Sequence, residues 1–121
     1  MQRSSRQYLE DILEYGQHVR QFTQGMSFEG YLADRRTRAA VERCFTVIGE
    51  ALGQAIRLSP SLQERVTDAG RIIGFRNILA HGYAVVDDHT VWGIVERYLP
   101  RLLAEVRAEL DAANRDDPDH E

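Results

Sequence analysis

Eight consecutive residues hold side chains that can act together on a phosphodiester. The stretch reads Arg-Asn-Ile-Leu-Ala-His-Gly-Tyr and includes Arg76, Asn77, His81 and Tyr83. Histidine titrates near neutral pH and can move a proton from a ribose 2′-hydroxyl or to a leaving 5′-oxygen. Arginine can hold the scissile phosphate, and tyrosine can stack on a base or donate a hydrogen bond to phosphate. The set predicts metal-independent RNA cleavage with the 2′-hydroxyl as internal nucleophile, a route that cannot cut DNA.

The spacing does not bring the arginine and the histidine of one chain onto the same atom. On an ideal helix Asn77 and His81 share a face, whereas Arg76 and His81 diverge by roughly 140°. Two copies facing each other across a symmetric dimer can combine them, so a homodimer is predicted. In the alternative interpretation, His81 and Gly82 form an ordinary helix end, with the imidazole near the last carbonyls, and the motif has no chemistry.

The remaining residues predict neither a metal nor a cofactor. No HxxxH or CxxC pairing exists, and the GRIIG segment at 70–74 lacks the lysine and spacing of a phosphate-binding loop. The single cysteine, Cys44, lies beside the apolar stripe of a predicted helix, where a buried structural thiol is expected. Three histidines lie outside the motif, and a solvated ring is expected for the first of them: His18, His89 and His120.

Charge and composition predict a cytoplasmic protein with no membrane span. No apolar run approaches the roughly 20 residues that span a bilayer, and Glu10, Asp11 and Glu14 stand where a signal peptide needs an apolar stretch. A lone cysteine agrees with a reducing compartment. The net charge of −4 disfavours RNA binding overall, so binding must depend on a local patch of arginines. The candidates are Arg35, Arg36, Arg38 and Arg71, beside Arg76.

The apolar periodicity predicts an all-α, up-and-down helical bundle of four main helices plus short ones. The helix that carries the motif should run from about Asp68 to His81. Gly70 and Gly74 weaken it by roughly 1 kcal/mol each relative to alanine, so tertiary contacts must hold it. Pro100 should distort the last helix near residues 96–97, because proline lacks a backbone donor. The predicted organisation is a helical domain at 1–113 and an acidic disordered tail at 114–121.

The predicted positions of the other elements complete this organisation. A first helix begins at Ser4 or Ser5 and ends near Gln24, with Tyr8, Ile12, Tyr15, Val19 and Phe22 on its apolar side. Ser27 begins a short helix that leads into an arginine-rich turn at 34–38. A third helix follows and ends at Ser59-Pro60. Its apolar stripe is Val41, Phe45, Ile48, Leu52 and Ala55.

Three segments in this order resemble the HEPN superfamily, specifically its HepT-like toxins. They are VERCFTVIGEAL at 41–52, GFRNILAHGY at 74–83 and VWGIVERYLPRLL at 91–103, the last with its internal proline. The resemblance covers about 8–110. It implies a helical bundle that dimerises so that two motifs meet in a cleft, and a ribonuclease that is the toxin half of a toxin–antitoxin pair. It implies catalytic roles for Arg76 and His81 and a supporting role for Asn77, with Glu50 a weaker candidate for that support.

The resemblance also implies a partner, an MNT-type nucleotidyltransferase antitoxin that transfers AMP from ATP to the motif tyrosine, here Tyr83. AMP on Tyr83 would add bulk and negative charge in a cleft that holds RNA phosphate. Two alternatives of other classes stay open. One is a non-catalytic HEPN module that docks onto and regulates a nucleotidyltransferase, and the other is a plain dimerisation bundle.

Overall fold

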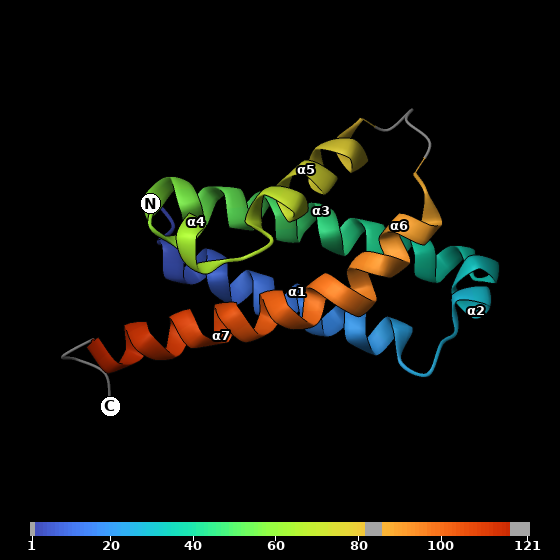
Figure 1. Cartoon of the computed structure of the whole chain (residues 1–121), viewed down its shortest axis with the longest axis horizontal. Coiled ribbons are helices and arrows are strands. Elements are labelled where there is room, and N and C mark those ends of the chain that lie inside the picture. The colour runs from blue at the N-terminus through green and yellow to red at the C-terminus, as the bar shows by residue number, and fades with distance from the viewer. Residues whose placement is uncertain (1, 82–85, 117–121) are drawn as a thin grey trace.

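Every regular element in the computed structural model, which describes residues 2–81 and 86–116, is helical (Figure 1). In chain order the elements are α1 (Ser5–Thr23), α2 (Phe28–Ala33), α3 (Arg35–Leu58), α4 (Leu62–Arg65), α5 (Ala69–Ala80), α6 (Asp88–Gly93), the π-helical segment η1 (Ile94–Tyr98) and α7 (Leu99–Asp116). The prediction of an all-α helical bundle is confirmed. The four predicted main helices correspond to α1, α3, α5 and the continuous α6–η1–α7.

The long helices α1, α3 and α7 run along the length of the molecule (Figure 1), and most of the buried core residues come from them. α1 packs against both α3 and α7, and α5 packs on the other side of α3. On α1, Ile12 and Val19 of the predicted stripe are fully buried, whereas Phe22 is 43% exposed. The α3 stripe is fully buried along its length, as the periodicity predicts: Val41, Phe45, Ile48, Leu52 and Ala55.

The arginine-rich segment expected as a turn is instead the first turn of α3. The Asp34 carboxylate caps this helix by accepting the Thr37 backbone N–H at 3.1 Å. Hydrogen bonds from Thr37 hold the pKa of Asp34 below its usual value. A carboxylate at the positive end of the helix dipole offsets the unfavourable placement of cations there, so the helix begins earlier than the charge pattern indicated. Those cations are Arg35, Arg36 and Arg38.

Pro100 distorts the last helix where the sequence predicts it. Since proline has no backbone N–H, the carbonyl of Glu96 lacks its usual donor, and the chain adopts the wider π-helical hydrogen bonding of η1. The Leu99 N–H reaches back five residues to the Ile94 carbonyl. The chain changes direction between α6 and α7 (Figure 1). α7 continues to Asp116, past the predicted start of the tail, and residues 117–121 lie outside the described ranges.

Tertiary contacts hold α5 in place at its N-terminus and on its buried face. Asp68, which precedes α5, is only 6% exposed and accepts two hydrogen bonds from the Arg101 guanidinium of α7, at 2.9 and 2.8 Å. Farther along, the Phe75 ring meets the edge of Phe45 from α3, with 5.7 Å between centroids. These contacts compensate for the glycines at 70 and 74, so the motif is carried by a helix that the bundle fixes.

No helix in the described part of the chain is long and apolar enough to cross a membrane.

Candidate active site

His81 terminates α5, and its ring is oriented by the helix that it ends. The helical hydrogen bonding stops at His81, whose backbone N–H bonds the Ile78 carbonyl at 3.2 Å. Its ring nitrogen Nδ1 lies 2.6 Å from the backbone carbonyl oxygen of Asn77. A carbonyl oxygen only accepts, so the ring proton of neutral His81 must be on Nδ1. Nε2 of the exposed ring is then the basic nitrogen, which suits a group that takes or returns a proton.

Arg76 lies one turn earlier, between α5 and α3. Its guanidinium donates to Oδ1 of Asn77 at 3.2 Å and forms an ion pair with Glu50 of α3 at 3.5 Å. The Arg76 side chain is 32% exposed, and within the described residues its buried Nε has no hydrogen-bond partner. Arg76 is therefore half-buried.

Asn77 connects the two residues that the sequence predicts to be catalytic. Its side-chain oxygen accepts from Arg76, and its backbone carbonyl accepts from the His81 ring. The structure thus brings these three residues into one hydrogen-bonded chain, without placing the guanidinium beside the imidazole. A role for Asn77 in orienting the site remains a prediction, and this contact pattern is its physical basis.

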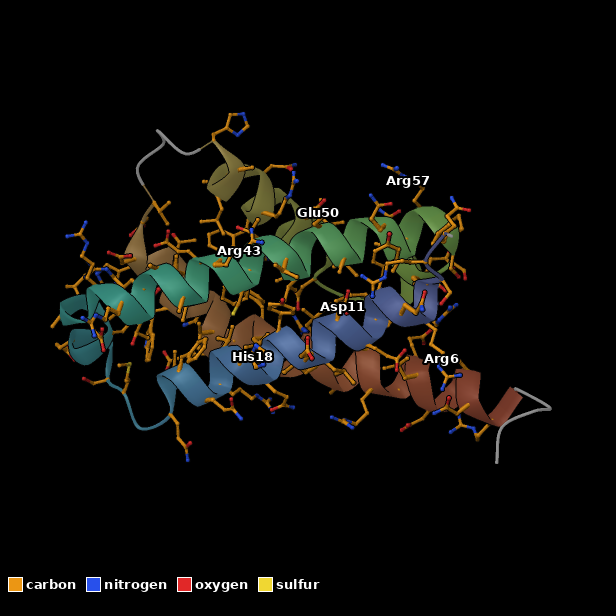
Figure 2. The ribbon with its side chains drawn as sticks, turned by 180° about the vertical axis from the view of Figure 1, so that it is seen from behind. Arg6, Asp11, His18, Arg43, Glu50 and Arg57 are labelled. Atoms are coloured by element: carbon orange, nitrogen blue, oxygen red, sulfur yellow. The ribbon has the colours of Figure 1, made fainter. Side chains whose placement is uncertain are left out.

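Glu50 contacts the motif from a different helix. Along α3 it lies between Arg43 and Arg57 (Figure 2). Its ion pair with Arg76 is long, and its side chain is 59% exposed, so solvent screens the attraction. A phosphate oxygen can replace the Glu50 carboxylate at small cost, so the ion pair positions Arg76 without blocking it. A small hollow of about 190 Å³ opens here, lined by Gly49, Glu50, Gly53, Gln54, Arg57, Ile73, Arg76 and Asn77.

Gly49 is the residue that sequence reasoning missed. A Cβ at this position would overlap the Cβ of Arg76 and lie 2.8 Å from its Cγ and 3.3 Å from the carbonyl oxygen of Ile72. The absence of a side chain therefore lets α3 and α5 approach closely enough for Arg76 to reach Glu50. The only signal in the sequence was the Ile-Gly-Glu-Ala string at 48–51. It belongs to a segment that resembles the HepT-like family, but the resemblance does not say why a glycine stands there.

The other candidate RNA-binding arginines do not join Arg76 in one patch. Arg35, Arg36 and Arg38 occupy the first turn of α3, and fourteen residues of helix separate Arg36 from Glu50, or about 20 Å. Arg71 is on α5 but lies over the Tyr98 ring of η1, with 4.5 Å between its guanidinium carbon and the ring centroid. Tyr83 and Gly82, both singled out by the sequence, lie outside the described residues.

The remaining histidines and the cysteine have structural surroundings. The His18 ring is half-buried between Tyr15 and Phe22, with centroid distances of 5.3 and 6.2 Å, rather than simply solvated as predicted. His89 stacks on Phe28 at 4.2 Å. Cys44 is buried, as predicted, and burial raises the pKa of its thiol, which disfavours the nucleophilic thiolate. No cluster of three metal-ligating side chains occurs in the described ranges, and His120 lies outside them.

Comparison with known proteins points to one family. The family model described as "Ribonuclease HepT-like" matches residues 12–109. A "Probable ribonuclease HepT" of Thermococcus cleftensis is 35% identical over 106 residues, which cover 84% of this chain and 92% of the relative. A "Putative RNase" of Methanocaldococcus jannaschii is 31% identical over 105 residues, 85% of this chain and 84% of the relative. No solved structure gives a significant match.

The contact between Gly49 and Arg76 makes a direct prediction about stability. Gly49→Ala forces α3 and α5 apart, so we expect the free energy of unfolding in urea to fall by about 1–3 kcal/mol. Gly53→Ala, one turn later on α3, is the matched control. Its Cβ would meet no atom within 4 Å, so it should be neutral or raise stability by up to about 1 kcal/mol. Equal effects of the two substitutions would refute the close-approach argument.

Proposed function

Because the chain belongs to the HepT-like ribonuclease family, we propose that it is a metal-independent endoribonuclease whose catalytic residues are Arg76 and His81. The observation that carries the proposal is the His81 ring. Its Nδ1 is tied to the Asn77 carbonyl, which leaves Nε2 as the basic nitrogen of an exposed imidazole at the end of α5. A half-buried arginine of the same helix, held among the described residues by a weak ion pair and a side-chain amide, supplies the phosphate ligand.

The reaction is an internal displacement at phosphorus. Nε2 of a neutral His81 accepts the proton of the ribose 2′-hydroxyl while the 2′-oxygen bonds to the adjacent phosphorus. The bond from phosphorus to the 5′-oxygen breaks, and a protonated imidazole gives that oxygen its proton. The products are a 2′,3′-cyclic phosphate and a 5′-hydroxyl. Arg76 binds the non-bridging oxygens and offsets the charge that grows on them.

A homodimer supplies what one chain lacks. Arg76 lies on the α3 side of α5, whereas His81 ends the helix on its exposed side, which supports a site built from two motifs. In a symmetric dimer the arginine of one protomer can act with the histidine of its partner, so each dimer holds two sites with one arginine and one imidazole each. The dimer is thus a requirement of the proposed chemistry.

The proposed biological role is that of a toxin neutralised by an MNT-type nucleotidyltransferase. In the neutralising step the Tyr83 phenol oxygen bonds to the α-phosphorus of ATP, pyrophosphate leaves, and the phenol proton passes to solvent. The attached AMP brings a negative phosphate and a bulky nucleoside two residues from His81. Charge and bulk at that point would repel and exclude an RNA strand.

The first test of this proposal is cleavage of purified RNA. The wild-type protein should cut single-stranded RNA in the presence of a metal chelator and leave cyclic phosphate ends, whereas His81→Ala should lower kcat/KM by about 10²-fold or more. His89→Ala, an exposed histidine of α6 outside the motif, should retain activity. Absence of cleavage by the wild type, or equal cleavage by wild type and His81→Ala, would leave the non-catalytic docking module as the better explanation.

Mixing two inactive variants tests whether the site is shared. Arg76→Ala and His81→Ala should each be inactive alone. After unfolding and refolding together they should regain about a quarter of wild-type activity, because half of the random dimers are mixed and one of two sites in each has both groups. No recovery from a mixture that light scattering shows to contain dimers would place both groups of each site on one chain.

Modification of Tyr83 has an independent readout. Incubation with an MNT-type partner and ATP should add one AMP, which mass spectrometry should locate on Tyr83, and the modified protein should lose RNA cleavage. Tyr83→Phe removes only the attacking oxygen and should stay unmodified. Addition of AMP to Tyr83→Phe, or to a different tyrosine of the wild type, would refute this assignment.

A further inference from the structure

A second hollow lies along α5 on the side away from Arg76. It has a volume of about 460 Å³ and lies between α5 and the α6–η1 segment. That volume is within the range of small-molecule sites and is adequate for one nucleotide. We call it the α5–η1 groove; its lining is Gly70, Arg71, Gly74, Phe75, Ile78, Thr90, Gly93, Ile94, Arg97 and Tyr98.

The charge of the α5–η1 groove is opposite to that of the whole chain. Its lining includes two arginines, Arg71 and Arg97, and no carboxylate. Within the described residues, the ion pairs within 4.0 Å involve neither of them, although four other arginines each pair with a carboxylate. In a protein of net charge −4, two exposed arginines without a carboxylate in a hollow favour an anionic occupant.

The groove also offers a flat stacking surface. The Arg71 guanidinium lies over the Tyr98 ring at 4.5 Å from the centroid, which holds the guanidinium in place. A planar guanidinium held in this way can stack a nucleobase on its outer face, as arginines and aromatic rings do in proteins that bind single-stranded RNA. An anionic phosphate attached to a flat base fits this pair of features better than an acidic peptide does.

Three glycines leave the groove open. No atom lies within 4 Å of a Cβ built on Gly70, Gly74 or Gly93, so packing within the chain does not explain the missing side chains. Each glycine inside a helix lowers the equilibrium constant for helix formation by up to about tenfold relative to alanine. Their common effect is that the helix backbones of α5 and α6 are uncovered along the groove, where a flat ring can approach closely.

We propose that the α5–η1 groove binds one unpaired nucleotide of the RNA next to the scissile phosphate, with the base stacked on Arg71 above Tyr98 and the phosphate bound by Arg97. The site rests on the proposed function, because it assumes an RNA substrate. Its position agrees with that role: Ile78, at one end of the lining, precedes His81 by three residues, or about 5 Å along the helix axis. The groove therefore selects single-stranded RNA, since a paired base could not enter it.

Binding is measured apart from cleavage. In the full-length His81→Ala protein, fluorescence anisotropy with a labelled short single-stranded RNA gives Kd across a salt series. Tyr98→Leu should weaken binding by about tenfold. Arg71→Gln combined with Arg97→Gln should also reduce the slope of log Kd against log salt by about one to two. Arg107→Gln, an exposed arginine of α7 outside the groove, is the control and should change neither quantity.

A groove-filling variant separates binding from folding. Gly74→Leu adds a helix-forming side chain where a Cβ meets no atom, so the protein should remain at least as stable to heat. It should nevertheless weaken RNA binding by about tenfold. Kd values equal to that of the His81→Ala parent for all groove variants would overturn the proposal. So would unchanged RNA binding accompanied by loss of the dimer in light scattering, because the groove would then be a contact between copies.

Cleavage assays distinguish failure of the groove from failure of the proposed function. With His81 restored, Arg97→Gln should reduce kcat/KM for a longer RNA about tenfold more than for a dinucleotide, which keeps the bases on both sides of the scissile phosphate but lacks the second phosphate that Arg97 binds. If the wild type cleaves both substrates and Arg97→Gln lowers the two kcat/KM values equally, the groove inference is wrong and the ribonuclease proposal stands. If the wild type cleaves no RNA, the ribonuclease proposal fails, and the anisotropy series still decides whether the groove binds RNA.

Discussion

The close approach of α3 and α5 at Gly49 is the constraint on which the candidate site depends. The two helices pack so closely here that α3 has no room for a side chain at position 49. A Cβ on Gly49 would occupy the space of the Arg76 side chain. Because the backbones are close, Arg76 reaches across to Glu50 while Asn77 and His81 stay on the exposed side of α5. The absence of a side chain at Gly49 therefore determines both how closely α3 and α5 pack and where the Arg76 guanidinium lies.

The same helix carries weaknesses that the bundle compensates. α5 has glycines on its exposed side, and its stability comes from contacts at its N-terminal end and on its buried face. The buried Asp68 carboxylate is neutralised by Arg101 of α7, and Phe75 packs on α3. A helix held in this way can leave its outer surface open to a partner. Side chains that would strengthen an isolated helix would also cover the groove beside η1.

The charge available for RNA binding depends on where single arginines lie and not on the net charge of the chain. The chain is acidic, and the sequence predicts that RNA binding depends on one local patch of arginines. The structure disperses those arginines: the first turn of α3 holds three of them, and Arg71 stacks on Tyr98. Instead of one patch, the structure has two separate cationic features. One is the half-buried Arg76, and the other is a short groove with two arginines that lack carboxylate partners among the described residues. Hollows with low-dielectric walls concentrate potential more effectively than exposed arginines on an open helix.

The sequence by itself determined the helical class, the fully buried stripe of α3, the distortion before Pro100 and the residues of the motif. These features are local: apolar periodicity, a missing backbone donor and side-chain chemistry are all properties of short segments. Only the tertiary structure decided that Gly49 must lack a side chain, that the Asp34 cap turns the arginine-rich segment into helix, and that Glu50 pairs with Arg76. The physical reason is that close approach, ion pairing and the opening of a groove depend on the distance between helices, which no single segment encodes.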